Sequence, residues 1–204
     1  MTLRSATVRH PPAEAHGGRR HRDPKEGWWL VHITLGEAYV SSNSEEVLTT
    51  VLGSCVSACI RDAAAGVGGM NHFLLPEGTG QDRLAMRYGV NAMELLINGV
   101  LKQGGVRQRL EAKLFGGANM MSSLHDIGAR NIEFAKKFLV EEDIPLVGGH
   151  LGGTSARRIQ FWPASGRARQ MVATSLEARL AESEFGQVRP GTATSVQGND
   201  VELF

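Results

Sequence analysis

The segment TVLGSCVSACIRD, residues 50–62, sets the architecture expected for this chain. It joins two runs of β-branched and apolar residues, 47–52 and 55–60, through the small pair Gly53-Ser54. Short apolar runs of this kind, bounded by turn residues, are typical of buried strands. The pattern therefore predicts either two strands or one bent strand with a sharp corner just before Cys55.

Further strands are predicted on both sides of this segment. Residues 28–35 (WWLVHITL) alternate in the manner of a strand, and residues 69–75 (GMNHFLL) form a short apolar run that Pro76 ends. Leu110, Ala112 and Leu114 alternate with charged residues up to the Gly116-Gly117 turn, in the manner of a strand. Later strands are predicted over 145–149, 158–162 and 167–174, with the last two joined as a hairpin through Ser165-Gly166.

Two segments have the spacing of amphipathic helices. In the first, apolar residues recur at helical intervals at Met86, Val90, Met93, Ile97 and Val100. The second is predicted over 128–142, with an inward face of Ile132, Ala135, Phe138 and Leu139. Strands and helices interleave without a regular β–α–β count. We therefore predict an α/β (α+β) layered sandwich, with a mixed β-sheet and two main helices.

Charge and composition narrow the classes of function. The balance of 22 basic and 21 acidic residues gives a formal charge of +1, which lacks the basic excess of a nucleic-acid-binding protein. The longest uncharged run, 47–60, is too short for a membrane helix, so no membrane insertion is expected. Two cysteines cannot build a secreted disulfide framework, which favours a cytoplasmic protein.

Three regions are predicted along the 204 residues. Residues 1–26 carry prolines, histidines and few apolar side chains, and we expect a disordered, basic lead. Residues 27–185 contain the strands and helices of one folded domain. Residues 186–204 are expected to be a flexible tail that ends in DVELF. Such an acidic and aromatic end can dock on a partner, or it can be a frayed terminus.

Cys55 is the first candidate for chemistry. It follows a sharp corner, where backbone N–H groups near Gly53 and Ser54 could face an oxyanion, as acyl transfer requires. A thiol needs a base or a positive partner to become a thiolate, and His72 on the next strand is the nearest candidate. The alternative is structural, since a free cysteine is a common core residue and a lone strand histidine is usually just hydrogen-bonded.

Other motifs carry less chemistry. On one strand Cys55 and Cys59 would lie about 13 Å apart, too far for a disulfide, so Cys59 is assigned to the core. A C-x₃-C pair alone does not match zinc sites, and GGHLGGTS lacks the lysine of a phosphate-binding loop. LGSCV departs from the serine hydrolase motif. We expect no metal and no cofactor, and we assign His125 and His150 to solvated loops.

Six blocks of the sequence resemble, in order, the CheD family, the chemoreceptor glutamine deamidases of bacterial chemotaxis. They are TVLGSCVSACIRD, GGMNHFLLPEG, RYGVNAMELLINGVLKQG, EAKLFGGANM, IGARNIEFAKKFL and LGGTSARRIQFWPASGRA. The match runs from about Trp28 to about Thr174, which is most of the chain. The resemblance implies an α/β sandwich around a β-sheet, as in deamidating toxins, with a Cys-His-Thr catalytic triad.

Carried over to this sequence, the resemblance implies Cys55 as the nucleophile and His72 as the base. The third member is either Thr49, by counting back without a gap, or Thr50, which begins the TVLGSC string. It would hold the imidazole in the productive tautomer. The thiolate would attack the carboxamide of a receptor glutamine, and backbone N–H groups near Gly53 and Ser54 would hold the oxyanion. Water would then hydrolyse the thioester to glutamate.

The resemblance also implies a partner and a location. The substrate would be the cytoplasmic coiled coil of methyl-accepting chemoreceptors, at receptor arrays, and the loops FGGANM and LGGTS are candidates for the surface that accepts it. The alternative is a regulatory module, non-catalytic or with a dual role, that binds chemoreceptors or the CheC phosphatase. A third reading is hydrolysis of receptor glutamate methyl esters through the same thioester.

Overall fold

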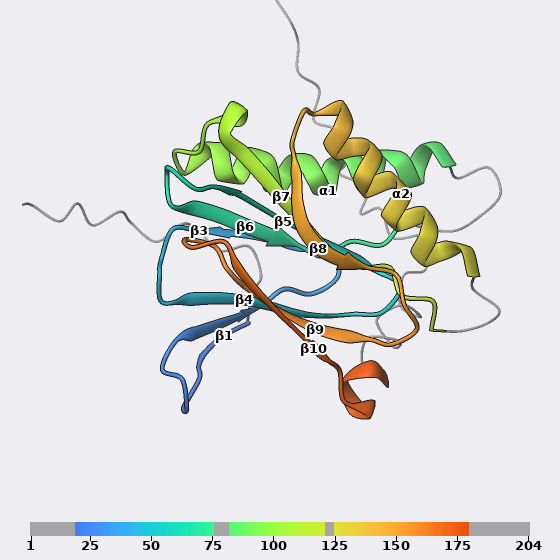
Figure 1. The fold of residues 1–204 in the computed structure, drawn as a ribbon, viewed down its shortest axis with the longest axis horizontal. Coiled ribbons are helices and arrows are strands. Elements are labelled where there is room, and N and C mark those ends of the chain that lie inside the picture. Colours follow the sequence, from blue (N-terminus) through green and yellow to red (C-terminus); the bar gives the residue numbers. More distant parts are fainter. Residues whose placement is uncertain (1–18, 76–81, 121–124, 180–204) are drawn as a thin grey trace, which may run out of the picture.

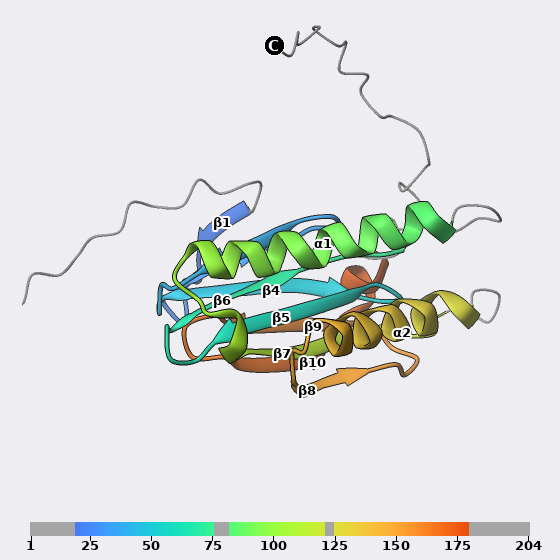
Figure 2. The same ribbon diagram turned by 90° about the horizontal axis from the view of Figure 1, so that it is seen from above.

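Two β-sheets are stacked face to face, and two helices cover the outer face of one of them (Figure 1, Figure 2). The computed structural model describes residues 19–75, 82–120 and 125–179. Side chains fill two separate layers, one between the sheets and one between the second sheet and the helices.

The first sheet has the strand order β1 (Arg19–Arg22), β2 (Trp29–His32), β4 (Glu46–Leu52), β9 (Arg157–Trp162) and β10 (Arg167–Val172). Only β2 and β4 pair in parallel among these neighbours, and the other pairs are antiparallel. β9 and β10 form the hairpin that the sequence predicts.

The second sheet has the order β3 (Ala38–Ser41), β6 (Val67–Asn71), β5 (Val56–Asp62), β7 (Leu110–Gly116) and β8 (Leu146–Leu151). Helix α1 (Asp82–Lys102) follows β6, and a single 3₁₀ turn, η1 (Arg107–Arg109), leads into β7. Helix α2 (His125–Glu141) connects the parallel strands β7 and β8. A parallel pair needs such a crossover. Both α1 and α2 pack on the outer face of the second sheet (Figure 2).

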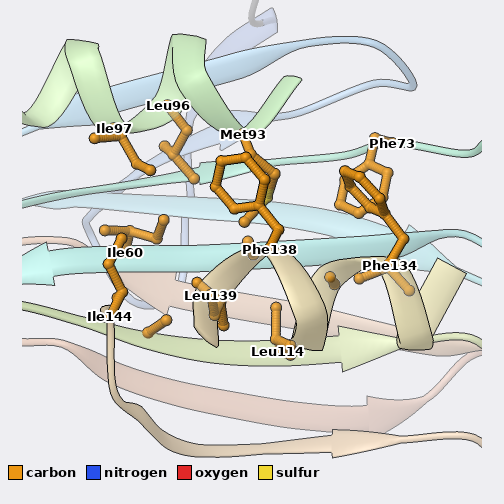
Figure 3. Close-up of a cluster of buried hydrophobic side chains, with 14 of the residues drawn as sticks. Ile60, Phe73, Met93, Leu96, Ile97, Leu114, Phe134, Phe138, Leu139 and Ile144 are labelled. Carbon is orange, nitrogen blue, oxygen red and sulfur yellow. The ribbon is translucent and has the colours of Figure 1, made fainter. Parts of the chain in front are cut away.

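Strand β5 contributes side chains to both layers. Val56, Ala58 and Ile60 pack against α1 and α2 in the core that Figure 3 shows. Cys55, just before the strand, and Cys59 belong to the core between the two sheets. Because successive side chains of a strand point to opposite faces, this alternation places Cys55 in the layer between the sheets.

The corner at Gly53-Ser54 separates two strands that belong to different sheets. Of the two readings of residues 50–62, two strands is therefore the right one. The predicted layered α+β architecture is confirmed, although the single mixed sheet is in fact two mixed sheets. Local periodicity predicts strands but does not assign them to a sheet, because long-range backbone pairing decides that.

Helix α1 buries a different stripe at its N-terminal end from the one predicted. Met93 is fully buried as expected, but Met86 and Val90 are 41% and 39% exposed. The buried position between them is Gly89, where a Cβ atom would lie 2.6 Å from the Phe134 ring. The helix approaches α2 through this small residue, and a search for large apolar residues misses it.

The predicted lead of residues 1–26 also differs from the structure at its end. β1 pairs antiparallel with β2, and the rings of His21 and His32 stack with centroids 5.1 Å apart. This strand has the sequence RRHR, so it carries no apolar alternation, and backbone pairing with β2 defines it. Residues 1–18, and the tail with DVELF, lie outside the described residues.

Candidate active site

The turn that carries Cys55 is held by the loop after β7. The carbonyl of Gly53 accepts a hydrogen bond from the Ala118 N–H at 2.8 Å, and the carbonyl of Cys55 accepts one from the Gly117 N–H at 2.7 Å. Both carbonyls therefore point into the body of the protein. A sharp turn between two sheets is kept in one conformation by these bonds.

The glycines of the FGG sequence are required at this place. Gly116 has φ +105°, and a Cβ atom there would lie 2.1 Å from the carbonyl oxygen of Cys55. Gly117 has φ +67°, and its Cβ would lie 2.4 Å from Ile132 Cγ1. Positive φ angles and such close approach are both open to glycine alone. These two residues therefore support the turn behind Cys55.

His72 lies on the segment that pairs with the start of β5. Val56 and Phe73 form an antiparallel bridge, with reciprocal backbone hydrogen bonds of 3.0 Å. In this register Cys55 and His72 share one face as diagonal neighbours, which places their Cβ atoms roughly 7–8 Å apart or less, within reach of an imidazole. Cys55 is 5% exposed and His72 is 2% exposed. The two groups that the sequence singled out thus meet at one edge of the layer between the sheets.

Thr50, and not Thr49, contacts the histidine. The Thr50 hydroxyl lies 3.0 Å from His72 Nδ1. The Thr49 hydroxyl instead donates to the carbonyl of Ile159 on β9 at 2.8 Å. Adjacent residues of β4 point to opposite faces, so only one of the two threonines can face the layer that contains His72.

Burial keeps the His72 imidazole neutral at neutral pH. Desolvation lowers its pKa from 6.5 to about 4, although an interaction with the backbone of Ile33 acts in the opposite direction. Nδ1 contacts Thr50, whereas the buried Nε2 has no hydrogen-bond partner among the described residues. A neutral ring with one nitrogen engaged and the other unengaged can accept a proton at the second nitrogen.

Cys59 occupies a different environment from Cys55. Both cysteines are reduced, and Cys59 is fully enclosed between the sheets. Burial raises the pKa of the Cys59 thiol far above its usual range, with weaker opposing effects from Ser57 and Lys113. A thiol of this kind stays protonated and unreactive, in agreement with the assignment of Cys59 to the core.

Three residues near Cys55 were not predicted from the sequence. Tyr88 on α1 is 38% exposed, and partial burial, with a smaller contribution from the nearby Cys55, raises its pKa. Met120 packs so closely on the turn that a Cβ at Gly53 would lie 2.6 Å from its sulfur. Asn131 on α2 is fully buried and donates to the Ser54 carbonyl at 3.0 Å. All three stand in blocks that carry the family resemblance, but no role was predicted for them individually, and only the tertiary packing brings them to the turn.

The two glycine loops predicted to flank the site are hydrogen-bonded to each other. Gly152 N–H donates to the Gly116 carbonyl at 2.9 Å, and Asn119 N–H donates to the Gly153 carbonyl at 2.8 Å. The buried Arg157 donates to the carbonyls of His150 and Gly152 and so anchors the second loop. His150 is exposed, as expected, but it lies on strand β8 and not in a loop. His125 is the first residue of α2 rather than a loop residue, and its side chain lies outside the described residues.

In the described ranges 19–75, 82–120 and 125–179, no group of three or more His, Cys, Asp or Glu residues could hold a metal ion. No helix in the same part of the chain is long and apolar enough to cross a membrane.

The family model and the sequence relatives agree on one family. Residues 74–171 match the family model described as CheD chemotactic sensory transduction. The chain is 49% identical over 191 residues to a protein of Caulobacter sp. (strain K31), which covers 92% of this chain and 99% of the relative. It is 51% identical over 177 residues to a protein of Agrobacterium fabrum, covering 85% and 96%. Both relatives are named "Probable chemoreceptor glutamine deamidase CheD".

Among solved structures, the hypothetical protein YfiH of Bacillus licheniformis matches with a TM-score of 0.37 and 12% identity, over 58% of this chain and 50% of that one. This likeness is too small to support an argument. The sequence relatives, by contrast, match at about half of their positions over nearly their whole length. The chain belongs to the CheD family.

Proposed function

We propose that this protein is a glutamine deamidase that converts specific glutamines of methyl-accepting chemoreceptors to glutamates, with Cys55 as the nucleophile. The observation that carries the proposal is the 3.0 Å contact between Thr50 and His72 Nδ1, beside the turn that presents Cys55. Its support comes from the family as well, because the curated relatives are named chemoreceptor glutamine deamidases.

The first half of the reaction is acyl transfer to the thiol. The N–H at His72 Nδ1 donates a hydrogen bond to the Thr50 hydroxyl oxygen and keeps its proton, so that the Nε2 lone pair takes the proton of the Cys55 thiol. The thiolate attacks the carboxamide carbon of the glutamine, and backbone N–H groups at Gly53 to Cys55 stabilise the oxyanion. The imidazolium then protonates the nitrogen, the C–N bond breaks, ammonia leaves, and a thioester remains.

The second half is hydrolysis. His72 takes a proton from a water molecule, the resulting hydroxide attacks the thioester carbon, and the Cys55 thiolate leaves. The product is a glutamate, so each event adds one negative charge to the substrate. On a helix bundle, like charges on neighbouring positions repel, which shifts the packing equilibrium of the receptor. A substrate on the cytoplasmic helices of receptors places the enzyme in the cytoplasm, at receptor arrays.

The test is deamidation of a purified receptor cytoplasmic fragment by the full chain, with peptides mapped by mass spectrometry. Wild type and Cys59→Ala are expected to convert glutamine to glutamate, because Cys59 is an unreactive core thiol on the strand that follows Cys55. Cys55→Ala is expected to convert none. Conversion by Cys55→Ala would overturn the assignment of the nucleophile. Binding of the receptor or of CheC without any conversion by wild type would replace the enzyme by a regulatory module.

A further inference from the structure

Asn131 makes two hydrogen bonds that connect the two segments of the candidate site. Its Oδ1 accepts the N–H of Leu75 at 2.8 Å, and its Nδ2 donates to the carbonyl of Ser54 at 3.0 Å. The two partners fix the orientation of the amide, since an N–H needs an oxygen and a carbonyl needs an N–H. Leu75 follows His72 by three residues, and Ser54 directly precedes Cys55. One side chain thus holds both segments.

The bond to Ser54 also determines the direction of the next N–H group. In a trans peptide the C=O and the following N–H point in opposite directions, and the described part of the chain contains only trans peptides. The carbonyl of Ser54 is held toward α2 by Asn131. The N–H of Cys55, in the same peptide plane, is therefore directed away from α2, and its direction depends on this bond.

Asn131 is a polar residue among apolar ones on the inward face of α2. It is fully buried on the inward face of α2, and the neighbouring inward residues Phe134, Ala135 and Phe138 are apolar. An apolar residue of similar size would leave the Leu75 N–H and the Ser54 C=O without this partner, at a cost of about 1–3 kcal/mol for each group that stays unpaired. Both of its bonds go to the backbone segments that carry Cys55 and His72, not to the helices.

We propose that Asn131 is a positioning residue, which orients the Ser54–Cys55 peptide so that the Cys55 N–H faces the oxyanion of the tetrahedral intermediate. The inference rests on the proposed function for its substrate, but its physical content concerns any acyl transfer to Cys55. Removal of one oxyanion donor typically lowers a rate by two to three orders of magnitude, so a misdirected donor should lower it by at least about tenfold.

The variant Asn131→Asp has nearly the same shape and isolates the bond to Ser54. One carboxylate oxygen still accepts the N–H of Leu75, while the other faces the Ser54 carbonyl and cannot donate when ionised. Protonation restores a donor at this position. The variant is therefore expected to lose activity at neutral pH and to recover part of it, relative to wild type, as the pH is lowered.

Two small reagents distinguish a loss of oxyanion stabilisation from a general loss of folded structure in the Asn131 variant, and neither assay needs the receptor. p-Nitrophenyl acetate acylates the thiolate through a tetrahedral oxyanion and expels p-nitrophenolate, whereas iodoacetamide alkylates it by direct displacement of iodide, with no oxyanion. For Asn131→Asp we expect acylation of Cys55 to slow by at least about tenfold and alkylation to change by less than about threefold. Cys55→Ala supplies the background for both reagents.

Leu139→Ala is the matched control for general destabilisation, because Leu139 is buried on the distal part of α2 and does not touch the turn. It should lower thermal stability without changing the ratio of acylation to alkylation. An unchanged ratio in Asn131→Asp would overturn the inference, whether both rates stay high or both fall. If wild type acylates but leaves every receptor glutamine intact, the proposed function fails and the ratio still decides the role of Asn131.

Discussion

Replacement of Thr50 by valine removes one hydrogen bond and changes the shape of the side chain very little. The Thr50 hydroxyl lies 3.0 Å from His72 Nδ1, and both groups are buried. Without it, the nitrogen has no partner and the ring loses the contact that selects its tautomer. We therefore expect Thr50→Val to lower kcat for deamidation.

The size of the effect follows from the cost of leaving a buried polar group unpaired, about 1–3 kcal/mol. Each 1.36 kcal/mol added to the activation free energy lowers the rate tenfold. If the full cost of the unpaired nitrogen is added to the activation free energy, kcat should fall roughly 5- to 150-fold. The assay is ammonia release from the receptor fragment, with urea unfolding of the same samples to measure the change in the free energy of unfolding.

Thr49→Val is the matched control within the same strand. Thr49 is fully buried and donates to the Ile159 carbonyl at 2.8 Å, so its loss should destabilise the fold by a similar amount. It does not contact His72, and kcat should stay within about twofold of wild type. A larger loss of kcat in Thr49→Val than in Thr50→Val would refute the assignment of Thr50.

Two further predictions concern pH and backbone geometry. The pKa of His72 is about 4 in the folded chain and 6.5 in the unfolded chain, so the unfolded chain takes up a proton first as the pH falls. The contribution of His72 to the free energy of unfolding is therefore complete above pH 6.5 and is lost as the pH falls toward 4, about 3 kcal/mol in all. Urea unfolding between pH 4.5 and 7.5 should show this slope in wild type, and an equal slope in His72→Gln would contradict the prediction. Gly116→Ala should destabilise the fold and slow alkylation of Cys55, because the new Cβ atom would lie 2.1 Å from the Cys55 carbonyl oxygen. The control is Gly104→Ala, which has a similar φ of +98° but no atom within 4 Å, and which should cost only the backbone strain of about 1–2 kcal/mol. Equal melting temperatures for the two variants would exclude the steric clash.

Most strands and both helices of the fold could be predicted from local patterns. The apolar runs on either side of Gly53-Ser54 are strands, and the predicted strand 69–75 overlaps the end of β6 and includes the segment of His72. The patterns did not predict β1 and β3. β1 has the sequence RRHR without apolar alternation, and β3 is only four residues long. Such short strands are defined by the neighbours they pair with rather than by their own periodicity.

In the candidate site too, local sequence patterns predict some residues, and long-range pairing decides others. A thiol after a sharp corner and a histidine on the next strand are visible in the sequence, because both depend on residues that are close along the chain. The choice between Thr49 and Thr50 is not visible there. It requires knowing which face of β4 lies against the second sheet, and that face is set by pairing with β9, more than a hundred residues away.

The amino-acid sequence by itself determined the layered α+β class, the candidate pair Cys55 and His72, and the resemblance to one family. The tertiary structure alone decided that the chain crosses between two sheets at Gly53-Ser54, that Thr50 faces His72, and that Asn131 reaches the turn from α2. The reason is physical: periodicity and turn residues act over a few neighbours, whereas sheet pairing and helix packing join residues that the sequence keeps far apart.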